Sequence, residues 1–400
     1  MTGPLVLTAC TAVSAAGRGV SAHRDALLSR TGGLVPNDFD PGVGGWIGRV
    51  PGVEAHALPP AMAGFDCRNN RLADMALRTD GFADAVAEAR AEHGADRIAV
   101  VLGTSTSGVT AAEDAYRRRD GDGLLPSGFD YEHTQDLFSL GSYVRTALGL
   151  RGPALVVSNA CASSARCFMD AEQLIRTGVC DAAVVGGADS LCRLTLHGFA
   201  ALELLSPTPC RPCAADRSGI SIGEAAGFAL LERADVRRRD GRTAPRLALL
   251  GAGASSDGYH MSHPHPEGAG AAGAMRQALR RAGLAARDVD WISLHGTGTR
   301  ANDAAEDLAV ASVFDDGVPC SSTKGWTGHT LGACGALEAV MAGECMAGGF
   351  VAGCLGIDAP DPAFRAHVVT RTLDRPVRTV VSNSFGFGGA NCSLVLGLLH

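Results

Sequence analysis

Aromatic and charged residues are scarce in this sequence, and positive charge is not in excess. Phe, Trp and Tyr make up 5% of the 400 residues and charged residues 19%, against 46% hydrophobic residues. This composition excludes a disordered chain, because enough apolar side chain is present to bury a core. The net charge of −7 argues against a general nucleic-acid binder, which carries a basic face.

Long hydrophobic runs and regularly spaced cysteines are also missing. No apolar stretch reaches the roughly 18 residues of a transmembrane helix, so no membrane span is predicted. The 13 cysteines are odd in number and irregularly spaced, which favours free thiols in a reducing compartment. Residues 7–10 resemble a lipoprotein cleavage site but lack a charged region before them. We therefore expect a cytoplasmic protein.

Short β-branched runs alternate with Ala-rich stretches of helix length, which is typical of a parallel-sheet α/β protein. The predicted strands are residues 98–102, 154–158, 182–185, 228–232, 247–250, 291–294 and 379–383. The predicted helices are residues 73–93, 162–177 and 269–282. In such sheets, reactive side chains follow the carboxyl ends of strands.

A charged stretch at residues 233–246 separates two halves with a similar layout. Each half opens with an apolar strand and a small-residue loop. Each later contains a strand that ends in a Gly/Thr turn, at residues 101–105 and 293–297. We therefore predict two pseudo-repeated halves, residues 1–240 and residues 241–400.

Cys161 follows a predicted strand at the point where an Ala/Ser-rich helix begins. Unpaired amide N–H groups and the positive end of the helix dipole favour the thiolate there, and they predict a lowered pKa. A thiol in this position can act as a nucleophile beside its own backbone N–H group. The alternative is a small buried hydrophobic side chain, which is our interpretation of most of the other cysteines.

Three further strand–loop junctions carry groups that could face such a thiol. His295 stands at a strand tip before a Gly-Thr-Gly-Thr turn, although a structural histidine is the alternative. Lys324 and His329 share a glycine-rich turn, and a helix bearing Glu338 follows. Residues 383–391 place two Phe among three Gly, and backbone N–H groups in such a turn can face a substrate.

Together these segments resemble the β-ketoacyl synthases of the thiolase fold, in the elongating Cys–His–His class. The resemblance runs through nearly the whole chain and includes residues 211–227, residues 256–261, and Asn302-Asp303 with Glu306. It implies an α/β fold of two pseudo-duplicated halves in a layered α-β-α-β-α arrangement. It also implies a decarboxylative Claisen condensation of a Cys-bound acyl chain with malonyl-acyl-carrier protein, which gives β-ketoacyl-acyl-carrier protein and CO₂.

The resemblance implies catalytic roles for five of the residues already named. Cys161 would accept the acyl chain from an acyl carrier protein by thioester exchange. His295 and His329 would drive decarboxylation and stabilise the enolate. Lys324 and Glu338 would hold the charge and hydrogen-bond network of the histidines, and the lysine would help to keep both imidazoles neutral.

The resemblance also implies how substrate is held. The backbone N–H groups of Cys161 and Phe387 would form the oxyanion hole, and Phe387 would gate the acyl pocket. Thr297, Thr299 and Phe385 would bind the phosphopantetheine arm. Because that arm arrives on the carrier protein, neither a metal nor a resident cofactor is expected.

His329 and Cys161 separate this chain from related classes. Initiating synthases have Asn where His329 stands, thiolases use a second Cys, and chain-length-factor subunits lack the reactive Cys. We expect an acyl-carrier-protein partner and either a homodimer or a heterodimer with a related synthase subunit. The run at residues 66–72, together with departures from the family pattern at residues 218–221, resembles synthases of type II polyketide and aryl-polyene clusters, and this resemblance implies that kind of pathway.

Three other functions remain open at this point. Housekeeping fatty-acid elongation shares every residue named so far. A partner subunit of a heterodimeric synthase would have the fold but an idle centre. A thiolase acting on coenzyme A esters would work without malonyl groups.

Arg68 and Arg71 lie where family members present basic residues to the acidic carrier protein, so they are the predicted docking residues. Cys210 and Cys213 have the spacing of a redox motif without its context, and we interpret Cys213 as a packing residue. A histidine cluster at residues 260–265 is interpreted as part of a loop beside the substrate tunnel, with a metal site as the alternative.

Overall fold

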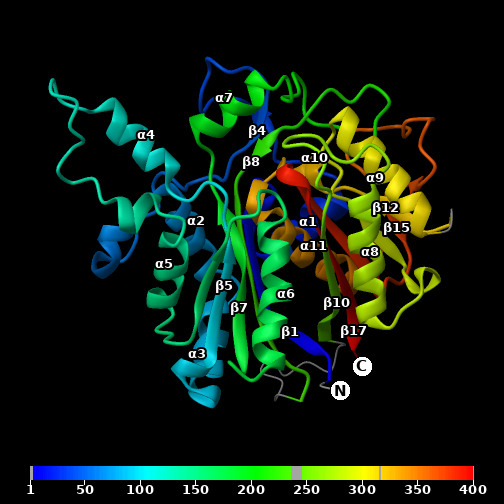
Figure 1. The fold of residues 1–400 in the computed structure, drawn as a ribbon, viewed down its shortest axis with the longest axis horizontal. Coiled ribbons are helices and arrows are strands. Elements are labelled where there is room, and N and C mark those ends of the chain that lie inside the picture. Colours follow the sequence, from blue (N-terminus) through cyan, green and yellow to red (C-terminus); the bar gives the residue numbers. More distant parts are fainter. Residues whose placement is uncertain (1–2, 236–245, 315–316, 400) are drawn as a thin grey trace.

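The main sheet of the protein is large and mixed (Figure 1). The computed structural model describes residues 3–235, 246–314 and 317–399. The 12 strands of this sheet follow the order β14-β12-β11-β16-β17-β10-β1-β9-β7-β5-β6, with β2 beside β1. Their bounds are β1 Leu5–Ser14, β2 Gly17–Arg18, β5 Ile98–Gly103, β6 Ala154–Val157, β7 Ala182–Asp189, β9 Ala225–Arg233, β10 Arg246–Ser256, β11 Trp291–Ser293, β12 Pro319–Ser321, β14 His367–Val368, β16 Thr379–Gly386 and β17 Ala390–Leu399.

Two small sheets and 11 α-helices accompany the main sheet in the described residues. The small sheets are β3 (Val35–Pro36), β4 (Trp46–Gly48) and β8 (Ile222–Gly223), and β13 (Phe350–Val351) with β15 (Leu373–Asp374). The helices are α1 Val20–Ser29, α2 Arg68–Leu77, α3 Phe82–His93, α4 Val109–Arg117, α5 Ser139–Ala147, α6 Ser163–Arg176, α7 Arg193–Ala201, α8 Ala269–Ala282, α9 Arg300–Val313, α10 Lys324–Thr327 and α11 Cys334–Gly348. None of the described helices is long and apolar enough to cross a membrane.

The main sheet repeats one strand order on either side of its centre. From the centre outward, the order is β1-β9-β7-β5-β6 on one side and β10-β17-β16-β11-β12 on the other. In both, the two inner pairs are antiparallel and the two outer pairs are parallel. The predicted pseudo-duplication is confirmed. The boundary predicted between residues 240 and 241 lies outside the described residues.

The sheet is mixed, whereas the strand and helix pattern predicted a parallel sheet. Each of the seven predicted strands overlaps a strand of the sheet, namely β5, β6, β7, β9, β10, β11 and β16. However, β16 returns directly through a tight turn into β17, and a short return of this kind pairs strands antiparallel. Each side of the sheet therefore contains both parallel and antiparallel strand pairs.

Two helices lie between the halves of the sheet, and others cover its outer faces. Helices α6 and α11 contact each other and strands of both halves. Helices α2, α3 and α5 contact the strands of the first half, while α8 lies against β10 and β17 with α9 beside it (Figure 1). The result is the expected α-β-α-β-α layering.

Glycines allow the central helices to approach the strands closely. A Cβ atom added to Gly103 of β5 would lie 2.4 Å from the backbone nitrogen of Ser164 in α6. One added to Gly227 of β9 would lie 3.1 Å from the backbone nitrogen of Leu337 in α11. The small residues therefore let α6 pack directly on β5 and α11 directly on β9.

The helix predicted over residues 73–93 is two helices. Between α2 and α3, Asp80 and Gly81 have φ values of 58° and 68°. A left-handed backbone cannot continue a right-handed helix, so the chain turns here. The other two predicted helices correspond to α6 and α8.

Candidate active site

Cys161 lies in a tight turn between β6 and α6. Its neighbour Ala160 has a φ of 47°, in the left-handed region, which turns the chain sharply from the strand toward the helix. The Ser163 hydroxyl closes this turn: it accepts the N–H of Asn159 at 2.8 Å and donates to the Ala160 carbonyl at 2.5 Å. The turn holds the thiol at the predicted strand–helix junction, where Cys161 is 7% exposed.

Two histidines from the second half, His295 and His329, face this thiol. His329 Nε2 lies 3.0 Å from Cys161 Sγ. The rings of His295 and His329 meet edge to face, with their centroids 5.1 Å apart. One side-chain nitrogen of each histidine and the Cys161 sulfur all lie within 4.8 Å of one another. The ends of β6, β11 and β12 thus bring three reactive groups together.

A buried ion pair stands behind the imidazoles. Lys324 Nζ lies 2.5 Å from Glu338 Oε1 and 3.4 Å from His295 Nδ1, and both charged side chains are at most 2% exposed. Burial first, and then the charge of Lys324, lower the pKa of His295 and of His329 well below the usual value. Both imidazoles are therefore neutral at pH 7, and the lysine acts in the expected direction.

The thiol itself is not acidified. Burial raises the pKa of Cys161 to about 12, and the charge of Asp189 acts in the same direction. Lys324 and the backbone N–H groups of Phe387 and Cys161 oppose this rise without cancelling it. The prediction of a lowered pKa was wrong, because desolvation of the thiolate exceeds the effect of the helix N-terminus. The resting thiol needs a base, and His329 Nε2 is within reach.

A second buried carboxylate fixes the tip of β11. Glu306 accepts the backbone N–H groups of His295 and Gly296 at 2.8 and 2.7 Å, and Asn383 Nδ2 lies 3.1 Å away. Burial raises the pKa of Glu306 to about 7. The sequence identified Glu306 as part of a motif but gave it no role. Its bonds to two successive amides show that it orients the loop that carries His295.

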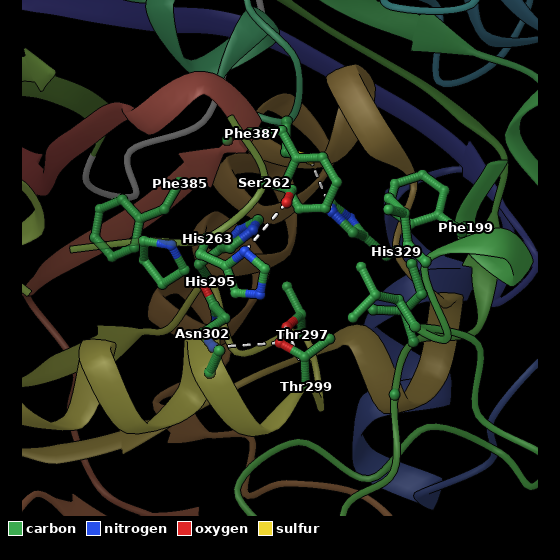
Figure 2. A pocket seen from close by; sticks show the side chains of 18 of the residues that line it. Phe199, Ser262, His263, His295, Thr297, Thr299, Asn302, His329, Phe385 and Phe387 are labelled. Carbon is green, nitrogen blue, oxygen red and sulfur yellow. Dashed lines mark hydrogen bonds between the residues drawn. The ribbon is translucent and has the colours of Figure 1, made fainter. Parts of the chain in front are cut away.

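Cys161 and both histidines line a cavity of about 360 Å³. Figure 2 shows the two histidines in its wall. Its walls include all of the residues predicted to hold or gate substrate, namely Thr297, Thr299, Phe385 and Phe387. Phe199 of α7 also lines it and lies 5.5 Å from Phe387, ring centroid to centroid. Sequence reasoning missed Phe199, because one Phe in an exposed helix gives no local signal.

Family models match most of the chain. Residues 61–236 match the model described as beta-ketoacyl synthase, N-terminal domain, and residues 247–358 match the corresponding C-terminal domain. The chain belongs to the β-ketoacyl synthase family. The 3-oxoacyl-[acyl-carrier-protein] synthase 2 of Rhizobium meliloti (strain 1021) is 36% identical over 346 residues, which cover 81% of this chain and 78% of that protein.

Solved structures agree with this assignment. A ketosynthase (ApeO) in complex with its chain length factor (ApeC) from Xenorhabdus doucetiae is 37% identical with a TM-score of 0.88, and the match covers 99% of this chain and 98% of that chain. The ishigamide ketosynthase/chain length factor is 28% identical with a TM-score of 0.90, and both chains are covered completely. The protein is an acyl-transferring ketosynthase.

The predicted docking arginines of this synthase both have partners within the chain. Arg68 donates to both carboxylate oxygens of buried Glu224 at 2.6 and 2.7 Å, and its side chain is 9% exposed. Arg71 donates to both oxygens of Asp66 at 2.5 and 2.6 Å, and its side chain is 28% exposed. Arg71 is the more accessible of the two. Their docking role stays a prediction.

The remaining segments singled out in the sequence lie beside the same site. His263 lines the cavity of the synthase, and its ring lies 4.7 Å from that of His260 at the surface. The loop at residues 260–265 therefore borders the cavity over Cys161. Cys210 and Cys213 are free and buried, and Cys210 donates to the Lys324 carbonyl at 3.2 Å, which fits a packing role.

Proposed function

We propose that this synthase loads an acyl chain onto Cys161 and condenses it with malonyl-acyl-carrier protein, in type II polyketide or polyene synthesis. The observation that carries the proposal is the convergence of the Cys161 thiol with His295 and His329 in one buried site. In the first step, His329 Nε2 takes the thiol proton and Sγ attacks the acyl thioester carbonyl. The bond from that carbonyl to the carrier's sulfur then breaks, and the carrier leaves as a thiol.

In the second step the malonyl thioester loses CO₂. The two electrons of the broken C–C bond pass to the thioester enolate, whose oxygen accepts N–H groups from the neutral imidazoles. Each such donor is worth about 3 kcal/mol in the transition state. The enolate carbon then attacks the acyl group on Cys161, and the thiolate leaves. The backbone N–H groups of Cys161 and Phe387 supply the oxyanion hole in this proposal, and Thr297, Thr299 and Phe385 hold the phosphopantetheine arm.

The pathway is proposed from the relatives and from the cavity. Two similar solved structures are described as ketosynthases with chain length factors. The cavity wall combines the aromatic rings of Phe199, Phe385 and Phe387, flat surfaces that suit a conjugated chain. Fatty-acid elongation is the second candidate, because the Rhizobium relative is a 3-oxoacyl-[acyl-carrier-protein] synthase.

A second synthase-like subunit is the proposed partner, and β6 is its proposed contact. β6 is the last strand at its edge of the main sheet, and its Leu155 is 42% exposed. Leu137 and Phe138 are 42% and 41% exposed just before α5, a helix that also contacts β6. An open sheet edge beside apolar side chains is a template for pairing with another chain.

Carrier-protein docking through Arg71, with Arg68 beside it, belongs to the same proposal. Arg71→Glu is expected to raise the KM for carrier protein without changing the alkylation rate of Cys161. A double change with Arg68→Glu is a poor test, because it leaves Glu224 buried beside a second carboxylate. A cytoplasmic location is also proposed, because all 13 cysteines are free thiols in the structure.

Intact mass spectrometry tests the proposed function. The synthase is incubated with saturated and polyunsaturated acyl-carrier proteins, beside Cys161→Ser. An adduct that depends on Cys161 is expected, and it should be largest with a conjugated chain. A preference for saturated chains would favour fatty-acid elongation. No adduct with any donor, even after addition of the co-purifying partner, would overturn the proposal.

A further inference from the structure

Asp189 is a fully buried carboxylate at the end of β7 that the proposed reaction does not use. Its Oδ1 accepts the Thr104 hydroxyl at 2.7 Å, the Ser105 N–H at 2.8 Å, and both the N–H and the hydroxyl of Thr106 at 2.9 Å. Its Oδ2 accepts the Ser105 hydroxyl at 2.5 Å and the Gly332 N–H at 2.6 Å. All six groups donate hydrogen bonds to Asp189. They suit an ionised carboxylate, because such a group only accepts hydrogen bonds.

The hydrogen bond from Gly332 to Asp189 joins the two halves of the protein. The other five hydrogen bonds come from the loop after β5, in the same half as Asp189. Gly332 belongs to the second half and follows His329 by three residues. A Cβ atom added to Gly332 would lie 2.8 Å from Asp189 Oδ2 and 3.2 Å from the hydroxyl of Ser163, which closes the Cys161 turn. The His329 loop thus packs against both Asp189 and the turn that holds the nucleophile.

Backbone hydrogen bonds hold the other side of the His329 loop against residues 221–223. The His329 N–H donates to the Ser221 carbonyl at 2.7 Å, and its carbonyl accepts the Gly223 N–H at 2.9 Å. With Asp189 on the opposite side, the loop is clamped between two elements of the first half.

We propose that Asp189 is a positioning residue of the synthase: through Gly332 it sets the His329 imidazole against the Cys161 thiol. The inference rests on the proposed function, since it assigns Asp189 a part in the steps that use His329. A misplacement of about 1 Å at a reacting group can reduce a rate by up to about 100-fold. Asp189 therefore affects turnover although it touches no reacting atom.

Asp189 also contributes charge to the site. The charged or titratable groups that face Cys161 are Asp189, Lys324, His295, His329 and Cys334. Among these, the negative charge of Asp189 raises the pKa of the thiol and the positive charge of Lys324 lowers it. Loss of the carboxylate charge is therefore expected to lower the pKa of Cys161, an effect that a purely structural residue would not have.

Two variants separate position from charge. Asp189→Asn removes the charge and gives Gly332 a poorer acceptor, so we expect malonyl-carrier-protein decarboxylation to fall roughly 10-fold. The pH midpoint of Cys161 alkylation by iodoacetamide should move down in the same variant. Gly332→Ala disrupts the same hydrogen bond but keeps the charge. It should slow decarboxylation without moving the midpoint down.

Ser105→Ala is the matched control, because it removes one donor to Asp189 and keeps the bond from Gly332. It should stay within about two-fold of the wild type in both measurements. The proposal is overturned if Asp189→Asn matches that control in both the decarboxylation rate and the alkylation midpoint. It is also overturned if Gly332→Ala decarboxylates as fast as the wild type. If Asp189→Asn does not fold, the decarboxylation rate of Gly332→Ala decides the test by itself. Failure of the proposed function is distinct, because the wild type would then not decarboxylate malonyl-carrier protein.

Discussion

The two halves of the synthase present equivalent strand ends to the active site, yet they carry different chemistry. β6 leads into Cys161, whereas its counterpart β12 leads into the turn with Lys324 and His329. β5 leads into the hydroxyl-rich loop that begins at Thr104, whereas its counterpart β11 leads into His295. In the proposed reaction, the first half supplies the nucleophile, and the second half supplies the base and the imidazole N–H donors.

This comparison shows what a duplicated fold provides. Two copies of one strand order bring two sets of carboxyl ends to the same place, so that side chains far apart in sequence meet. The duplicated backbone does not repeat the residues, and each half can specialise. Each half also places buried charge beside the site: Asp189 lies in the first half, and the Lys324–Glu338 pair lies in the second.

The division of labour is tested most strongly by one substitution in each half. Cys161→Ala should abolish acyl loading, a loss of at least about 1,000-fold, because no sulfur remains to form the thioester. It should retain malonyl decarboxylation, because both imidazoles stay in place. His329→Ala should reduce decarboxylation roughly 100- to 1,000-fold. It should also slow loading, because the base that takes the thiol proton in the proposed first step is gone, but the thiol remains and loading stays measurable. Radiolabel transfer and CO₂ release measure the two steps, and equal loss of both steps in both variants would contradict the division.

The second half should also depend on its buried ion pair. Lys324→Met leaves Glu338 buried without its partner, so we expect a loss of about 3–5 kcal/mol in the free energy of unfolding. Lys324→Met combined with Glu338→Leu should recover much of that loss, because no charge then remains unpaired. Urea denaturation of both variants measures the effect. A double variant as unstable as the single one would show that the pair is not coupled.

The smallest expected effect is the pH dependence of stability. His295 and His329 have pKa values well below the usual value in the folded protein, while in the unfolded chain each titrates near about 6.5. Below that pH the unfolded chain binds protons that the folded protein does not, so stability falls with falling pH. Each histidine contributes a slope of about 1.4 kcal/mol per pH unit. Between about pH 5 and 6.5, the free energy of unfolding of His329→Gln should fall less steeply with falling pH than that of the wild type. Equal slopes would show that His329 does not contribute to the pH dependence of stability.

Much of the fold was accessible from sequence, because its signals are local. All seven predicted strands overlap real ones, since each is a short β-branched run between turn residues. The break between α2 and α3 was missed. Asp80 and Gly81 gave only a weak local signal inside an otherwise helical pattern. Strand direction was also missed, because pairing joins residues far apart in the chain.

The sequence by itself determined the reactive residue types and their places at strand ends, since Cys161, His295 and His329 each follow a recognisable local pattern. Only the tertiary structure decided their chemical state. Burial in the folded protein raises the pKa of Cys161 to about 12, whereas the helix dipole alone predicted a lowered pKa. The fold also places Arg68 in a hydrogen-bonded ion pair with Glu224. It also placed Asp189 behind the His329 loop. The physical reason is that desolvation and charge–charge distances depend on the packing of both halves, whereas strand and turn signals depend on neighbouring residues alone.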